Sequence, residues 1–166
     1  ALGQGIGVAT SLATLHLEFE WCKLGDTGVC ELGDTGAAAL GRGIGAAKSL
    51  ATLHLEFKSC ELGDTGVAKL GQGIRAAKSL ATLQLTFETC PNISDTGWAA
   101  LGQGIGVATS LATLHLEFRS CPKLGDTGVA ALGQGIGVAT SLATLHLKFI
   151  WCKFGDTGVA ALGQGI

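Results

Sequence analysis

Residues 110–140 read SLATLHLEFRSCPKLGDTGVAALGQGIGVAT, and this stretch decides the fold because close copies of it make up nearly the whole chain. The phrase SLATLHLEF, or a near variant of it, begins at Ser11, Ser49, Ser79, Ser110 and Ser141. The successive separations are 38, 30, 31 and 31 residues. A fixed period in this range is typical of proteins that stack one small structural unit on the next.

Each copy contains two local periods. Over residues 114–119, leucines and a phenylalanine alternate with polar residues, which predicts a half-buried strand. The segment 126–140 instead spaces its apolar residues at three and four, which predicts a helix with Asp126 or Thr127 as the N-cap. Glycines at positions 133, 135 and 137 weaken such a helix, but they thin it and let adjacent helices approach closely.

The pattern L-x-x-L-x-L, followed by a cysteine, by L-G-D-x-G and by an amphipathic helix, resembles the leucine-rich repeat. The cysteine and the repeat length resemble the ribonuclease-inhibitor-like class of that family. Two additional residues separate the strand from the cysteine here, which predicts a longer strand or a wider turn. The resemblance implies an α/β solenoid of about five repeats of 30–31 residues, a curved right-handed superhelix with a parallel sheet on its concave side and helices on its convex side.

Element widths also predict a curved stack. Neighbouring strands lie about 4.8 Å apart, whereas packed helices lie roughly 8–10 Å apart, so the strands should line the inside. Because these helices are rich in alanine and glycine, we expect closer helix spacing and a shallower arc than usual.

The repeats predict one solenoid domain over residues 1–166, and we expect it to be a segment of a longer array because neither end shows a polar capping unit. The long first interval has a local cause, since residues 24–36 contain the GDTG motif twice. We therefore expect a loop extension at residues 23–31, with Cys30 as the thiol outside the repeated cysteine position.

Charge and hydropathy exclude several classes of protein. The chain has 11 basic and 13 acidic residues, a balance that does not favour nucleic-acid binding. Segments 96–116 and 127–147 carry no formal charge and are long enough to cross a bilayer. However, they contain glutamine, histidine, threonines and glycines, and near-identical repeats would have to insert in alternating directions. We therefore predict that the chain does not span a membrane.

The motifs that suggest catalysis have structural explanations. The triplet DTG begins at Asp26, Asp34, Asp64, Asp95, Asp126 and Asp156. In aspartic proteases this triplet carries one of two facing carboxylates, whereas stacked repeats would place six aspartates in a row, where helix capping explains them all. The glycines at 102, 104 and 106 have the wrong spacing for a dinucleotide-binding loop. We predict no enzyme, no catalytic residue and no cofactor.

Five of the six cysteines recur once per repeat, at Cys22, Cys60, Cys90, Cys121 and Cys152. Stacked side chains point in one direction, which is poor geometry for disulfides. The family resemblance implies buried thiols that bond weakly to turn carbonyls. No C-x-x-C pair is present, which argues against structural zinc. We therefore predict reduced cysteines and an intracellular location.

The candidate partner-binding residues are the polar residues of the predicted strands, which fall into three columns. The first column contains His16, His54, Gln84, His115 and His146. The second contains Glu18, Glu56, Glu117 and Lys148, and the third Glu20, Lys58, Glu88 and Arg119. A row of histidine and glutamate at strand spacing has the ligand types for a divalent metal. We nevertheless interpret these columns as a solvated polar face and predict no metal site.

Charge also separates by side. We expect Arg42, Lys48, Lys69, Arg75 and Lys78 in the helices, and the acidic residues on the strand face or in turns. A mildly acidic strand face favours a basic or amphipathic partner. We therefore predict a non-enzymatic scaffold that binds a protein through its concave strand face. The alternative is a structural subunit or linker within a larger assembly, including a membrane-associated one.

Overall fold

The computed structural model describes residues 2–20 and 33–166, so the predicted 23–31 extension, Cys22 and Cys30 lie outside the described residues. In the described part, helices and strands alternate regularly. The elements are α1 (Leu2–Val8), β1 (Thr14–Glu20), α2 (Asp34–Ala46), β2 (Thr52–Lys58), α3 (Asp64–Ala76), β3 (Thr82–Glu88), α4 (Asp95–Gly106), β4 (Thr113–Arg119), α5 (Asp126–Gly137), β5 (Thr144–Ile150) and α6 (Asp156–Gly165).

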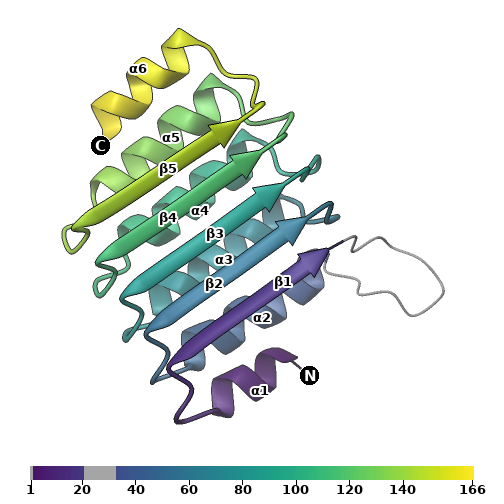
Figure 1. The fold of residues 1–166 in the computed structure, drawn as a ribbon, viewed down its shortest axis with the longest axis vertical. Coiled ribbons are helices and arrows are strands. Elements are labelled where there is room, and N and C mark those ends of the chain that lie inside the picture. Colours follow the sequence, from purple (N-terminus) through teal and green to yellow (C-terminus); the bar gives the residue numbers. More distant parts are fainter. Residues whose placement is uncertain (1, 21–32) are drawn as a thin grey trace, which may run out of the picture.

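The strands form one parallel sheet in the order β1-β2-β3-β4-β5, and the helices lie side by side behind it (Figure 1). Neighbouring strands pair so that equivalent repeat positions face each other. The predicted interior row of leucines is thereby confirmed: Leu53, Leu83 and Leu114 are fully buried. Leu15 and Leu145, on the outermost strands, pack against the same core while partly exposed.

Each strand separates two environments by alternation, as its sequence predicts. In β2 the leucines and Phe57 are buried, and the intervening residues are partly exposed. A second interior row consists of phenylalanine rings, of which Phe57 and Phe87 stack with centroids 5.2 Å apart. The polar residues on the opposite side of β1–β5 form what we call the strand face. The strand register confirms the three predicted columns on it.

The helices pack backbone against backbone, which confirms the close approach expected from their glycines. A Cβ atom added to Gly73 in α3 would lie 2.7 Å from the carbonyl carbon and from the Cα of Gly41 in α2. One added to Gly104 in α4 would lie 2.5 Å from the carbonyl oxygen of Gly71. Real Cβ atoms do not approach backbone so closely, so these positions require glycine. The shallower arc stays a prediction.

The two additional residues before each cysteine lengthen the strand. β2 runs to Lys58, and the next residue, Ser59, turns the chain with a left-handed backbone (φ 54°). Thr89 and Ser120 do the same after β3 and β4. This conformation costs non-glycine residues about 1 kcal/mol. Ser59 nevertheless donates its backbone N–H to the Glu88 carbonyl at 2.8 Å, which extends the pairing between strands by one bond.

The predicted N-caps are wrong. α5 begins at Asp126 itself and its N-cap is Gly125, so neither Asp126 nor Thr127 occupies the capping position. Instead, the aspartate accepts a hydrogen bond from the next repeat: Asp126 Oδ1 lies 2.7 Å from the backbone nitrogen of Gly155, the N-cap of α6. α5 also ends at Gly137, three residues before the predicted end of the helix at Thr140.

The same bond recurs at the earlier repeat junctions. Asp34 Oδ1 accepts from the backbone nitrogens of Gly63 and Gly66, both at 2.9 Å. Asp95 Oδ1 accepts from Gly125 at 2.9 Å. A carboxylate at a helix N-terminus is also favoured by the helix dipole. The aspartates that begin α2 to α5 therefore tie their own helix to the start of the next one.

The predicted separation of charge between the two sides needs two corrections. Arg42 lies in α2, and Lys69 and Arg75 lie in α3, as expected. Lys48 and Lys78 instead follow the ends of α2 and α3, in the turns that lead into the next strands. The DTG aspartates of the described residues occupy first helical positions rather than strands or turns: Asp34, Asp64, Asp95, Asp126 and Asp156.

Candidate functional site

The strand face is mildly acidic, as the sequence predicts. Over β1–β5 it carries five glutamates against two lysines and one arginine, together with the four histidines. Its charged members are Glu18, Glu20, Glu56, Lys58, Glu88, Glu117, Arg119 and Lys148. Their contacts divide the face into two parts with different chemistry.

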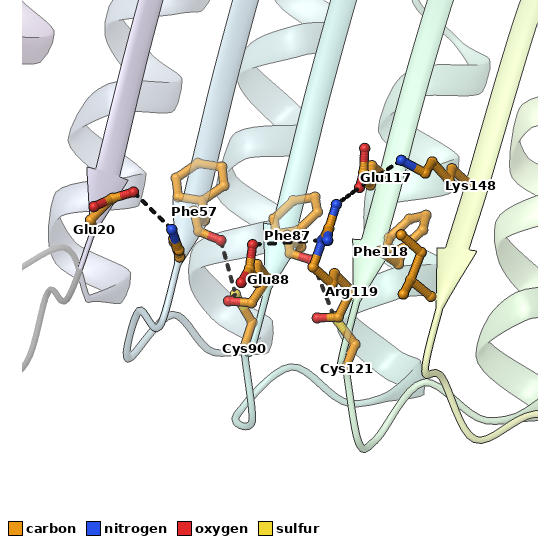
Figure 2. A network of polar contacts seen from close by, with 12 residues as sticks. Glu20, Phe57, Phe87, Glu88, Cys90, Glu117, Phe118, Arg119, Cys121 and Lys148 are labelled. Carbon is orange, nitrogen blue, oxygen red and sulfur yellow. Dashed lines mark hydrogen bonds and ion pairs between the residues drawn. The ribbon is translucent and has the colours of Figure 1, made fainter.

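Over β3, β4 and β5 the charges neutralise one another (Figure 2). Arg119 lies between two carboxylates, with Nη2 2.5 Å from Glu117 Oε1 and Nε 3.6 Å from Glu88 Oε2. Lys148 Nζ lies 3.3 Å from the same Glu117 oxygen. Partial burial would by itself raise the pKa of Glu117, but hydrogen bonds from Arg119 and Lys148 hold this pKa below its usual value. Glu117 is therefore an ion-paired carboxylate rather than an exposed acidic contact.

Over β1 and β2 the carboxylates have different neighbours. Lys58 donates to Glu20 at 3.1 Å, and this hydrogen bond raises the pKa of the lysine. Glu18 and Glu56 lie beside histidines instead: His16 Nε2 is 3.2 Å from Glu18 Oε1, and His54 Nε2 is 2.9 Å from Glu56 Oε1. The acidic character of the strand face therefore concentrates at this end.

The histidines form two pairs with different geometry. His16 and His54 stack with ring centroids 3.9 Å apart and planes 14° from parallel. His115 and His146 meet edge to face at 5.2 Å and 84°. Gln84 lies between the pairs and breaks the column. His115, His146 and Gln84 also line a shallow depression of about 140 Å³ with Glu117 and Lys148.

The structure thus brings the candidate residues together as two clusters rather than one uniform acidic face. Lys148 stands where other strands carry Glu56 or Glu117, and Arg119 stands where they carry Glu20 or Glu88. The column assignment already contained this signal. The sequence did not show the side-chain conformation of Arg119, which contacts both Glu88 and Glu117.

The DTG carboxylates are used in structural bonds. Asp34, Asp64, Asp95 and Asp126 each bond to the helix start of the following repeat. These aspartates follow one another in a row along the stacked repeats, as the repeat predicts, and their bonds link neighbouring repeats.

The four described repeat cysteines donate hydrogen bonds across repeat junctions, which confirms the expected weak bonding. Cys60 Sγ lies 3.4 Å from the Phe19 carbonyl oxygen, and Cys121 Sγ lies 3.6 Å from that of Phe87. These acceptors belong to the ends of strands rather than to turns, a correction that follows from the longer strand (Figure 2). Burial raises the pKa of Cys121 to about 12 and raises that of Cys90 further.

We expect the thiols to differ in reactivity according to burial. Cys152 is half-buried, and burial raises its pKa too, but Cys90 and Cys121 are fully enclosed. Because the thiolate is the reactive form, iodoacetamide should modify Cys152 at least ~10-fold faster than Cys90 or Cys121 in the folded protein. Peptide mass spectrometry over a time course measures each rate. Equal rates for Cys90 and Cys152 would contradict the enclosed thiol row.

The search for membrane spans gives a limited result. Among the helices of residues 2–20 and 33–166, none is both long and apolar enough to cross a bilayer.

One comparison with known proteins identifies the repeat. The family model for the Leucine Rich repeat matches residues 51–71, which contain β2 and the first half of α3. No curated protein matches the chain. The strand-helix unit that the family model matches recurs along the chain, with five parallel strands in one open sheet, and this pattern fits a leucine-rich repeat protein. The ribonuclease-inhibitor-like class stays a prediction.

Leucine-rich repeat domains generally mediate protein–protein interaction and are typically not enzymes.

Proposed function

We propose that this protein is a non-enzymatic scaffold that binds a protein partner through its strand face. The observation that supports this is the sidedness of the molecule: the helices lie on one side of the sheet (Figure 1). The burial pattern of the strands places the polar columns on the other side, where they are partly exposed. The strand face is a row of aligned, partly exposed side chains on a regular backbone. Such a rigid surface loses little conformational entropy on binding.

The partner should present basic or amphipathic chemistry to β1 and β2. Glu18 and Glu56 are 55% and 38% exposed at the side chain, and in the described part of the chain neither forms an ion pair with a lysine or arginine. Glu117 is only 24% exposed and already paired. Charge complementarity should therefore come mainly from the first two strands, with β4 and β5 contributing polar contacts.

Site-specific crosslinking tests which side is the interface. A photocrosslinking amino acid at Thr86, in the middle of the strand face, should capture the partner from an extract of the source cells. The same amino acid at Gln103, exposed on α4, should not capture it. Capture only from Gln103 would contradict strand-face binding.

Neutralising the acidic end tests the partner's chemistry. With the captured partner, the double variant Glu18→Gln and Glu56→Gln should bind about tenfold more weakly. Binding should also lose part of its salt dependence. The matched control is Gln72→Lys with Gln103→Lys, which changes net charge by the same amount on the helix side. If the control weakened binding equally, the effect would be one of net charge rather than of the strand face.

The second candidate function is a structural subunit packed in a larger assembly. It is favoured by exposed valines at equivalent positions near the ends of three helices, Val8, Val107 and Val138, which are 47–77% exposed. Burying these apolar side chains against another protein would lower the free energy of the assembly. A monodisperse monomer of the isolated chain in size-exclusion chromatography supports the free scaffold, whereas stable co-purification supports the subunit.

We further propose an intracellular location. Cys90, Cys121 and Cys152 lie in separate repeats and no disulfide links them in the described part of the chain, an arrangement that suits a compartment where thiols stay reduced.

A further inference from the structure

The geometry points to a divalent metal site on the strand face, formed by His16, His54 and Glu56 with a carboxylate oxygen of Glu18 as the fourth ligand, and its chemistry is that of Zn²⁺. Its test needs no protein partner, although Glu18 and Glu56 also belong to the surface proposed to bind one. It replaces, for β1 and β2, the solvated polar surface expected from the sequence.

Ligand spacing is the first argument. His16, His54 and Glu56 each offer one ligand atom, and these three atoms lie within 4.8 Å of one another. Zn²⁺ binds imidazole nitrogen and carboxylate oxygen at about 2.0–2.2 Å, so the ligand atoms of a tetrahedral site lie about 3.3 Å apart. The observed separations of 2.9 Å (His54 to Glu56) and 3.2 Å (His16 to Glu18) are close to this value. Rotation of the exposed His16 side chain would close the remaining gap.

The second argument is the state of the His54 nitrogen. Nε2 of His54 is buried and makes no hydrogen bond of acceptable geometry, although Glu56 Oε1 lies only 2.9 Å away. A buried polar atom without a hydrogen bond is costly. A cation coordinated by both atoms would satisfy the nitrogen and the carboxylate together. The ring of His16, stacked on that of His54, brings a second nitrogen to the same place.

The backbone explains why these side chains meet. His16 faces His54, and Glu18 faces Glu56, on paired parallel strands. A histidine and a glutamate two residues apart in a strand project on the same face, so two adjacent strands supply two pairs. Imidazole and carboxylate together suit Zn²⁺ and similar transition-metal ions.

The other strands lack this combination. In β3 the corresponding residues are Gln84 and Thr86, neither of which replaces an imidazole or a carboxylate. In β4 and β5, the His115–His146 pair lies beside Glu117, but Arg119 and Lys148 already occupy that carboxylate. The described strands therefore contain one complete set of ligands. Gln84 and Thr86 also show which residues can replace the histidine and the glutamate on this sheet.

Metal titration tests the site with variants that the strand face already tolerates. The probes are Co²⁺, followed by its visible absorption, and Zn²⁺ in competition, with the tag-free chain and with accessible thiols alkylated beforehand. Wild-type protein should bind one equivalent. His16→Gln and Glu56→Thr, which copy Gln84 and Thr86, should each weaken binding at least ~10-fold. The matched control His115→Gln should leave binding unchanged, and circular dichroism should show the same fold for all four proteins.

X-ray absorption of the zinc-loaded protein gives an independent readout. It should show nitrogen and oxygen neighbours at about 2.0–2.2 Å and no sulfur at about 2.3 Å. Three results would overturn the assignment: no saturable binding by wild type up to about 1 mM metal, equal loss from His115→Gln and His16→Gln, or sulfur in the zinc shell.

Discussion

Replacing Gly73 with alanine is expected to lower the free energy of unfolding by about 3 kcal/mol, in the upper range for overpacked sites. The added methyl would overlap the Gly41 backbone, whose carbonyl carbon and Cα would both lie 2.7 Å away, with the carbonyl oxygen closer still. Backbone cannot rotate aside as a side chain can. α2 and α3 would have to separate, which loosens the packing of Leu70 and Ile74, both buried. Equilibrium unfolding in urea measures the change.

Gly5 provides the matched control. It occupies the same position of the repeat in α1, and a Cβ added there would meet nothing within 4 Å. Gly5→Ala should therefore raise stability by about 0.5–1 kcal/mol, the ordinary gain in helix propensity. If Gly73→Ala were also neutral or stabilising, the helices would not be in backbone contact.

Replacing Asp64 with alanine is expected to cost about 2 kcal/mol, the typical value for hydrogen bonds to a charged group. Asp64 accepts from the Ser94 backbone nitrogen at 2.7 Å and from its hydroxyl at 2.6 Å, so the change removes the bond between α3 and the start of α4. Gly97 belongs to the same arrangement, because a Cβ there would lie 2.5 Å from Asp64 Oδ1. Asp64→Asn should cost less, since it keeps the accepting oxygen.

Asp156 separates this bond from a purely local effect. It begins α6 as Asp64 begins α3, but α6 is the last helix of the described structure. In a protein of residues 1–166, Asp156→Ala should therefore cost only the interaction with its own helix dipole, about 0.3–1 kcal/mol. Equal losses for Asp64→Ala and Asp156→Ala, measured by the same urea unfolding, would show that the aspartates act within their own helices.

The sequence was sufficient to predict the strands, the facing columns and the buried rows. Leu53, Leu83 and Leu114 fall at one position of the repeat. Because the repeats stack in register, all three residues lie in the same environment, the buried side of the sheet. The close helix approach was also predictable, because glycines such as Gly71 and Gly73 in a helix need a reason that helix propensity does not supply.

The partners of side chains that reach across repeats were not predictable in the same way. For Asp126, a bond to its own helix and a bond to the next one are both compatible with the sequence, and only the start of the helix at Asp126 selects the second. The left-handed backbone conformation of Ser59 could not be predicted, because serine rarely adopts it, whereas a glycine at that position would have indicated it. The grouping of His16, His54 and Glu56 required side-chain distances as well as the register.

The repetition of the aspartate bond and the glycine contact at successive junctions has an evolutionary consequence. Every repeat that is cut at the same point of the period carries the same aspartate and the same helix glycines. It can therefore form the usual contacts with any repeat that comes before or after it. Recombination between the near-identical segments can therefore lengthen or shorten the protein by whole repeats, and each new junction keeps the contacts of the existing ones. Selection can then change the outward-facing residues of each new repeat separately.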